Sequence, residues 1–206
     1  MEVTNQNTEQ ILLEAAEKLF IEKGFDGAKM TEIARLAGVN HALLHYYFRT
    51  KENLFNQIFE QKASQILKSF LTVTDDDAPF FEKLKDGIEA HFDFISKNPK
   101  LPLFVLREVV LDKSRRVFLE KNLFPMGEML YKNFKTSIRK EVKKGTIRPV
   151  KALDLLLNIV SLNIFAFIAA QIMFDMDAEE NQKKIQIFLE ERKRNNVKLI
   201  INSLKK

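Results

Sequence analysis

Three histidines are the only side chains of this 206-residue sequence that titrate near neutral pH, and His41 and His45 lie four residues apart. Side chains at this spacing share one face of a helix, where two imidazoles could bind zinc. The residues between them are Ala42, Leu43 and Leu44, so the glutamate of the metalloprotease motif is absent. The sequence has no cysteine, which excludes thiolate ligands and disulfides. We therefore expect no metal site and no cofactor.

The same inventory of reactive side chains argues against an enzyme. Nucleophilic catalysis needs a nucleophile, a base and a group that orients the base, and the sequence shows no such pattern. The formal net charge of +5 is compatible with a polyanionic partner. Composition alone does not separate DNA from RNA or from no partner. The position of the charge is therefore more informative than its sum.

The histidine pair lies in the second of two short predicted helices. The first runs from about Thr31 to Ala37, and Gly38 can end it by adopting a positive φ. Asn40 can cap the second helix, which is expected to reach Phe48.

A longer helix is expected before this pair, from about Asn7 to Gly24, with one apolar stripe. Apolar side chains of the two short helices can pack against Leu19 and Phe20 of that stripe and so set the crossing angle. These side chains are Ile33, Ala34, Ala37, Val39 and Leu44. Helices in this order form a helix-turn-helix unit, which offers its last helix to the major groove of DNA.

The order of residues in this segment resembles the TetR/AcrR family of transcriptional regulators. The resemblance is carried by Gly24-Phe25, Met30-Thr31-Glu32-Ile33-Ala34, Ala37-Gly38-Val39-Asn40 and Leu44-His45-Tyr46-Tyr47-Phe48-Arg49-Thr50-Lys51-Glu52-Asn53-Leu54-Phe55. It covers about the first quarter of the chain closely, whereas the remainder resembles the family only in helix pattern and length. The resemblance therefore implies a DNA-binding head in detail and a ligand-binding body in general terms.

Carried over position by position, the family pattern implies eight DNA-binding residues. Four would face base edges, namely His41, Ala42, Leu43 and His45. Thr31 would hold a phosphate at a helix start. Three would contact the DNA backbone, namely Tyr46, Tyr47 and Lys51. Ala42 and Leu43 are a departure, because apolar side chains can contact thymine methyl groups but form no bidentate hydrogen bonds. Specificity is then expected to rest on His41, His45 and DNA shape.

Some of these side chains have a simpler interpretation. Tyr46 and Phe48 could be core residues, which we accept for Phe48, and Arg49 with Lys51 could be a solvated helix start. Over residues 29–51 the basic residues outnumber the acidic ones only modestly. Electrostatic DNA binding grows with the number of phosphates neutralised, so one head is expected to bind weakly and two heads to be needed.

The rest of the chain predicts helices without strands, because Gly and Pro are few and apolar residues recur three and four positions apart. A connector helix is expected from Lys51 to Phe70, followed by a turn-rich stretch from Thr72 to Pro79. Later helices are expected at Phe80–Ile95, Leu101–Leu111, Ser114–Lys121, Pro125–Lys144, Lys151–Phe174 and Asn181–Leu204. The predicted fold is all-α with about nine helices: residues 1–50 form the head, and residues 51–206 form the connector and a larger ligand-binding and dimerisation body.

The stretch from Ala152 to Phe174 is nearly long and apolar enough to cross a bilayer. It is interrupted by Asp154, Asn158, Ser161, Asn163 and Gln171. Unpaired polar groups are costly in lipid, so a helix buried between other helices is the better interpretation. The first ten residues also lack the pattern of a secretory signal. We expect a cytoplasmic protein with no membrane partner.

The last two predicted helices are the expected homodimer element, because the first of them is apolar on more faces than a small body can cover. The candidate contacts are Leu156, Ile159, Val160, Asn163, Phe167, Ile185, Phe188, Leu189, Val197 and Ile200. The alternative is that these side chains form intrachain core, which is expected to claim about half of them.

The central region is rich in phenylalanine, and ordinary core is the first explanation. The family resemblance nevertheless implies a cavity for a small apolar or aromatic effector. The candidate contacts are His91, Phe92, Phe104, Arg107, Glu108, Tyr131, Phe134, Asn163 and Phe167. Each polar member could instead be a structural residue with its hydrogen bonds satisfied.

Together these patterns predict a ligand-responsive transcriptional regulator. The resemblance implies a repressor that binds double-stranded DNA, at a palindromic operator, as a homodimer and leaves it when the effector binds. The alternative is an architectural or partner-recruiting DNA-binding protein with a filled body and no effector. A large apolar cavity would favour the regulator.

Overall fold

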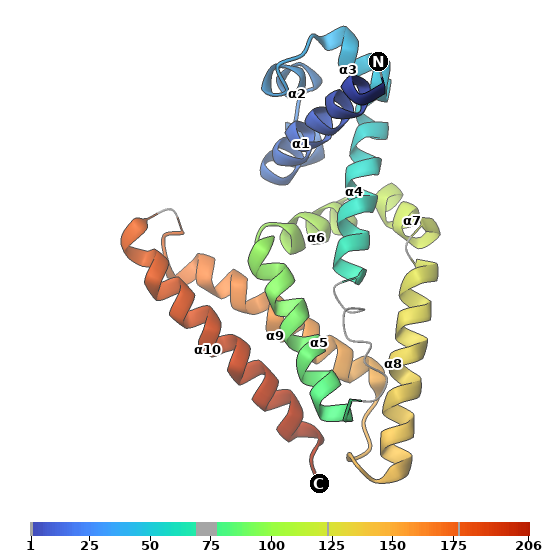
Figure 1. Ribbon diagram of the computed structural model, residues 1–206, viewed down its shortest axis with the longest axis vertical. Helices are drawn as coiled ribbons and strands as arrows, with labels where there is room; N and C mark the ends of the chain where they lie inside the picture. The colour runs from blue at the N-terminus through green and yellow to red at the C-terminus, as the bar shows by residue number, and fades with distance from the viewer. Residues whose placement is uncertain (1, 69–77, 123, 177) are drawn as a thin grey trace. The chain divides into compact units, whose positions relative to one another are not determined.

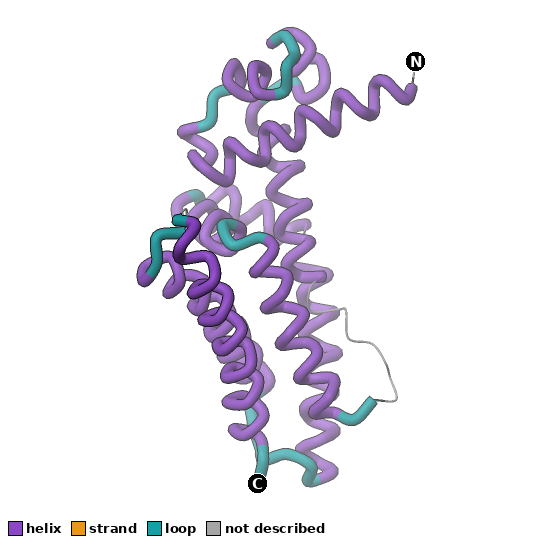
Figure 2. The backbone as a smooth tube through the Cα atoms, turned by 60° about the vertical axis from the view of Figure 1, so that its left-hand side comes forward, coloured by secondary structure: helices purple, strands orange, loops and turns teal. Residues whose placement is uncertain are grey.

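The computed structural model describes residues 2–68, 78–122, 124–176 and 178–206, and the regular structure in these ranges is entirely helical (Figures 1 and 2). The helices are α1 Glu2–Gly27, α2 Met30–Leu36, α3 His41–Phe48, α4 Lys51–Lys68, α5 Phe80–Lys97, α6 Leu101–Leu111, α7 Lys113–Asn122, α8 Phe124–Lys144, α9 Ala152–Met173 and α10 Glu179–Leu204. The all-α prediction is confirmed, with ten helices in the described part of the chain where about nine were expected. Phe70 and the first part of the turn expected from Thr72 to Pro79 lie outside the described residues.

The chain forms two compact units. The first contains residues 1–64 and 100–123, and the second contains residues 65–99 and 124–206. The first unit therefore contains α1–α3, the larger part of α4, and the whole of α6 and α7. The second unit contains α5 and α8–α10. Compactness does not show which segments act together, so the domain boundary expected at residue 50 stays a prediction.

The core of the first unit is aromatic. Phe20 of α1 meets Phe55 of α4 edge to face with 5.0 Å between ring centroids, and Phe55 stacks on Phe59 at 5.4 Å. Phe104 of α6 lies 6.0 Å from Phe59, so α6 shares this core. The four rings are at most 2% exposed. Burial of such a side chain contributes roughly 1.5–3 kcal/mol, so this cluster stabilises the packing of α1, α4 and α6.

The expected end of the first helix at Gly24 is a kink inside α1. Gly24 has φ 73° and ψ 179°, and helical structure resumes up to Gly27. A Cβ at Gly24 would lie 2.7 Å from Nη2 of Arg107, so the position needs glycine for its backbone angle and for this close approach. The kink brings the backbone to α6, where Arg107 donates to the Phe20 carbonyl at 3.4 Å and Glu108 accepts from the Phe25 N–H at 3.3 Å.

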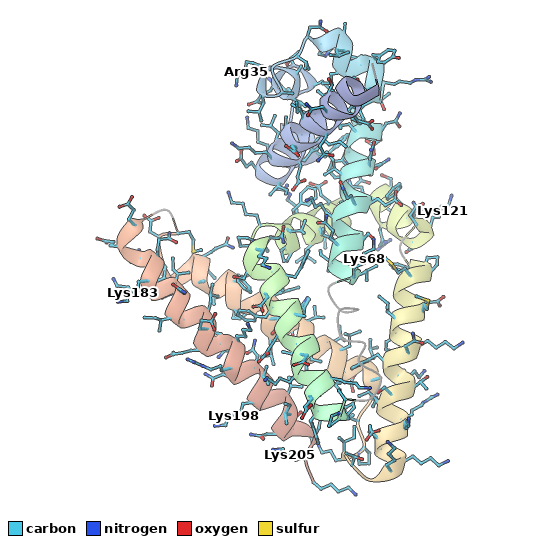
Figure 3. All side chains as sticks on the ribbon, in the orientation of Figure 1. Arg35, Lys68, Lys121, Lys183, Lys198 and Lys205 are labelled. Carbon is cyan, nitrogen blue, oxygen red and sulfur yellow. The ribbon has the colours of Figure 1, made fainter. Side chains whose placement is uncertain are left out.

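The second unit is built around α9, which packs against α5, α8 and α10. Its largest apolar cluster contains Ile88, Ile138, Leu155, Ile200 and Leu204, all at most 1% exposed. Figure 3 shows basic side chains such as Lys183 and Lys198 projecting from α10. The α10 helix is therefore amphipathic, with its apolar side in this core.

A chain of polar side chains crosses the core of the second unit. Arg192 donates to the Asn196 amide oxygen at 3.0 Å, and Asn196 donates to the Asn163 oxygen at 3.0 Å. Asn163 in turn donates to the Ile88 carbonyl at 2.9 Å, and its nitrogen lies 3.1 Å from Nδ1 of His91. The carbonyl only accepts, so the Asn163 amide nitrogen faces it, and His91 Nδ1 must accept from that nitrogen. These hydrogen bonds offset the cost of burying His91, Asn163 and Asn196.

Helix α9 passes the length and composition test for a bilayer span, alone among the helices of the described residues, and 33% of its most apolar window is buried inside the chain. Its buried face carries Asn163, which is fully buried and hydrogen-bonded as described above. Its other face carries Leu153, Leu157, Phe165 and Ile172, each at least half exposed. The interpretation as a helix buried between others thus holds for one face of α9.

Candidate DNA-binding site

Helices α2 and α3 are joined by the tight turn that the sequence predicts. Gly38 adopts φ 69°, and the Val39 N–H donates to the Ala34 carbonyl at 3.0 Å, which closes the end of α2. Asn40 caps α3, because its side-chain oxygen accepts from the Leu43 N–H at 2.8 Å. Two local signals, a glycine and an asparagine, therefore determine where α2 ends and α3 begins.

The buried side of α2 and α3 faces the core of the first unit. Ile33, Ala34, Leu44 and Phe48 are at most 4% exposed, and Leu19 and Phe20 of α1 are also buried. Helix α2 contacts both α1 and α3. Ile33, Ala34 and Leu44 are buried as the expected packing requires, whereas Ala37 and Val39 are partly accessible. Their contact with Leu19 and Phe20 stays a prediction. Phe48 is core, as the simpler interpretation predicted.

The opposite side of α3 faces solvent. His41, Ala42, His45 and Tyr46 are exposed, Tyr46 to 74%, and Leu43 and Tyr47 are partly exposed. The interpretation of Tyr46 as core is therefore wrong, since the buried side chains of α3 are Leu44 and Phe48, four residues apart. All four residues predicted to read base edges are brought together on the accessible side of one helix.

The positively charged side chains around this surface have different partners. Arg35, one of the basic residues between positions 29 and 51, is exposed on α2 and projects from it (Figure 3). The acidic residue next to it, Glu32, pairs with Lys23, and this hydrogen bond holds the pKa of the Glu32 carboxyl below its ordinary value. Thr31 is exposed in the first turn of α2. Arg35 is thus a basic group on the same accessible side as Thr31, and neutralisation of Glu32 favours approach of an anion.

Lys51 lies at the start of α4, beside the end of α1. Its ammonium group donates to the Asp26 carbonyl at 3.4 Å and lies 4.5 Å from the centre of the Phe25 ring. These contacts are weak and partly exposed, so they position the ammonium group without removing it from solvent. The phosphate contact expected for Lys51 stays a prediction.

The two histidines of α3 pack against each other. Their ring centroids are 4.4 Å apart in an edge-to-face arrangement, and His45 Nδ1 lies 2.8 Å from the Arg49 carbonyl. Arg49 ends α3 with φ 58°, a conformation uncommon for a side chain other than glycine. In the described residues no group of three or more histidine, aspartate or glutamate side chains could hold a metal ion.

A buried arginine on α7 contacts the end of α1 and the start of α4, and no pattern in the sequence predicted it. The Arg115 guanidinium of α7 lies 4.0 Å from the ring centres of both Phe25 and Phe55. Its Nε is 3.2 Å from carboxylate oxygens of both Glu108 and Asp112. Nε and Nη1 are buried and lack hydrogen-bond geometry to any group in the described part, so the attraction is electrostatic. Nothing local in the sequence distinguishes Arg115 from the exposed Arg116.

The nine candidate effector residues are divided between the two units. Phe104, Arg107 and Glu108 lie in the first unit, where Arg107 and Glu108 contact the kink of α1. The other six lie in the second unit: His91, Phe92, Asn163 and Phe167 are buried, whereas Tyr131 and Phe134 are partly buried at the edge of the core. Four of the polar candidates, Arg107, Glu108, His91 and Asn163, form hydrogen bonds with protein groups.

The helix-turn-helix segment of the chain is similar to a known protein family. Residues 12–58, which contain α2, α3 and the start of α4, match the family described as bacterial regulatory proteins, tetR family. The chain belongs to the TetR family. It is a transcriptional regulator with a helix-turn-helix DNA-binding segment, and it is not an enzyme.

Individual relatives of this TetR-family regulator are distant. The chain is 24% identical over 140 residues to the HTH-type regulator YhgD of Bacillus subtilis, a match that covers 68% of this chain and 72% of YhgD. It is 28% identical over 123 residues to the regulator AcrR of Shigella flexneri, and the match covers 56% of this chain and 47% of AcrR. The solved structure of the TetR-family regulator PfmR from Thermus thermophilus has the same fold, with a TM-score of 0.69, 21% identity and coverage of 95% of this chain and 99% of PfmR.

Proposed function

We propose that this TetR-family regulator is a repressor that binds a palindromic operator as a homodimer and is released by a small apolar or aromatic effector. The accessible face of α3 carries this proposal, because His41, Ala42, Leu43 and His45 share it while Leu44 and Phe48 anchor the helix in the core. An exposed helix of this kind, held by a short turn, is what enters a major groove.

The contacts with DNA divide into two classes. Base edges would be read by His41, Ala42, Leu43 and His45, and phosphates would be held by Thr31, Tyr46, Tyr47 and Lys51. We add Arg35 as a further candidate phosphate contact, because it is exposed on α2 one turn from Thr31. Phosphate contacts strengthen binding to every duplex, whereas base contacts strengthen binding only to the preferred one.

The dimer is proposed from the exposed face of α9. Leu153, Leu157, Phe165 and Ile172 are spaced by four, eight and seven residues, so they lie along one side of the helix. Each is at least 50% exposed. A stripe of this kind on a helix of mostly apolar residues is typical of a protein interface. A second copy of the chain is the occupant that also supplies the second head.

The effector is proposed from the apolar composition of the second unit. Among the nine candidate contacts, Tyr131 and Phe134 are the best placed, because both are partly accessible at the edge of the core. A matched protein of Bacillus subtilis, 26% identical over 98 residues, is named fatty acid metabolism regulator, and we choose an acyl chain as the candidate effector by analogy with that name. A fatty acid or a derivative with an acyl chain would fit these side chains.

The test begins with selection of duplexes from a random DNA library by the purified protein. A selected palindrome bound by a dimer supports the proposal, and retention of no duplex at low salt overturns it. Palmitate and benzoate are then titrated against the bound operator. An effector must lower operator affinity, because a ligand that binds both states equally shifts nothing. Binding of either probe without loss of operator affinity would favour an architectural protein instead.

A further inference from the structure

The hydrogen bond of His45 determines where its ring carries a proton. Nδ1 lies 2.8 Å from the Arg49 carbonyl oxygen, and a carbonyl oxygen can only accept a hydrogen bond. Nδ1 must therefore carry a hydrogen and donate it. In the neutral ring the second nitrogen, Nε2, then carries no hydrogen and is an acceptor. Because His45 is exposed on α3, this acceptor belongs to the surface proposed to read DNA.

The end of α3 holds this arrangement in place. Arg49 donates its N–H to the His45 carbonyl at 2.9 Å, and its φ of 58° turns the chain so that its own carbonyl meets the His45 ring. The ring of His41 packs edge to face against the His45 ring, with 4.4 Å between their centroids. The orientation of the His45 ring is thus set by α3 itself before any DNA is bound.

An acceptor in the major groove can pair with few groups. The hydrogen-bond donors there are the amino groups at N6 of adenine and N4 of cytosine, whereas guanine N7 and O6 and thymine O4 are acceptors. We propose that His45 is a specificity-determining residue whose Nε2 accepts a hydrogen bond from the amino group of one adenine or cytosine of the operator. This inference rests on the proposed function and names the chemistry of one of its base contacts.

The first test is made on the free protein and needs no DNA. Long-range ¹H–¹⁵N spectra distinguish the two neutral forms of a histidine ring, and the chain has three histidines, which are assigned by single substitutions. We expect the form with hydrogen on Nδ1 for His45. His91 is an internal reference with the opposite form, because its Nδ1 accepts from Asn163. A His45 ring with hydrogen on Nε2 at neutral pH would overturn the inference.

The second test uses a selected operator and base analogues. Each adenine is replaced in turn by purine, which lacks the N6 amino group, and each cytosine by 2-pyrimidinone, which lacks the N4 amino group. We expect one such replacement to weaken binding of the unchanged protein by roughly tenfold or more, the loss of one good base contact. The same replacement should leave the affinity of His45→Phe unchanged, because Phe keeps the ring but has no acceptor. His41→Phe is the matched control and should still show the loss.

The outcomes separate this inference from the proposed function. If no duplex is selected, both are overturned. If an operator is selected but no amino group couples to His45, this inference alone is overturned. Coupling of His45 to a guanine, detected by replacement with 7-deazaguanine, would also overturn it, because guanine N7 requires a donor.

Discussion

His91 and His45 are the same residue type in opposite environments. His91 is 1% exposed and accepts from Asn163, whereas His45 is exposed and donates to Arg49. Burial lowers the pKa of His91 from its ordinary value of 6.5 to about 4. The Asn163 N–H that points at its Nδ1 acts in the same direction, since a protonated ring could not accept.

The stability of the protein should therefore depend on pH through His91. Between pH 6.5 and about 4 the unfolded chain binds a proton at His91 that the folded chain does not bind, so the free energy of unfolding falls as the pH is lowered. The loss should approach about 3 kcal/mol at pH 4. Urea titrations at pH 7, 5.5 and 4.5 measure it. His91→Gln, which does not titrate, should lose less stability over this range, and an equal loss in both proteins would contradict the assignment.

Glycine is needed at Gly38 for its backbone angle alone. Gly38 has φ 69°, and a Cβ there would meet nothing within 4 Å. Gly38→Ala should lower the free energy of unfolding by about 1–2 kcal/mol, the cost of a left-handed conformation for an L-residue. Gly127 lies inside α8 and has room for a Cβ, with Leu67 Cδ2 at 3.9 Å, so Gly127→Ala should be neutral or stabilising. Thermal unfolding of both variants tests the contrast.

At the scale of helices, α6 and α7 are attached to the head through a few specific side chains. Glu108 accepts from the Phe25 N–H, and the Arg115 guanidinium lies 4.0 Å from the ring centres of both Phe25 and Phe55. The end of α1, the start of α4 and the α6–α7 pair thus meet at one charged and aromatic cluster. Displacement of α6 or α7 would have to disturb this cluster or move α1 and α4 with it.

Removal of the buried arginine should be much more damaging than removal of its exposed neighbour. Arg115→Met leaves Glu108 buried without its main cation and should lower the free energy of unfolding by about 3–5 kcal/mol, as for one partner removed from a buried ion pair. Arg116→Met changes the same charge at an exposed position and should be within about 0.5 kcal/mol of the unchanged protein. Urea unfolding followed by circular dichroism measures both, and similar effects would show that Arg115 is not a structural residue.

At the scale of the whole molecule, the apolar face of α9 predicts self-association. Leu157→Glu and Phe165→Glu place a charge in the middle of the exposed stripe and should convert the dimer into a monomer, because burial of an unpaired carboxylate is costly. Lys132→Glu, at an exposed position of α8, is the matched control and should remain dimeric. Light scattering during size-exclusion chromatography gives the mass. A monomer for the unchanged protein would contradict the proposed interface.

The division into phosphate contacts and base contacts predicts how single substitutions change the DNA affinity of the dimer. Tyr47→Phe and Lys51→Ala remove proposed phosphate donors and should weaken binding to every duplex several-fold, with a shallower dependence on salt for Lys51→Ala. His45→Ala should weaken binding to the selected operator only. Titrations against operator and unrelated duplexes at two salt concentrations measure the difference. Equal losses on all duplexes for the three variants would contradict this division of roles.

Several features of this protein could be predicted from the sequence because their signals are local. Gly38 needs a positive φ, Asn40 carries its own cap acceptor, and apolar spacing sets the buried side of α3. These signals depend on neighbours within a few residues, so the helix-turn-helix and most helix ranges follow from them.

The tertiary structure alone decided which apolar and polar residues are shared between distant helices. Six of the ten dimer candidates are intrachain core, close to the half expected, namely Ile159, Asn163, Phe167, Ile185, Val197 and Ile200. The exposed apolar stripe of α9 is on the other face of that helix. Arg115 meets the ring of Phe55 from another helix far back in the chain, and Asn163 lies 72 residues from His91. Such contacts leave no periodic trace in the sequence, because burial depends on which helices meet, and that is determined by the packing of the whole chain.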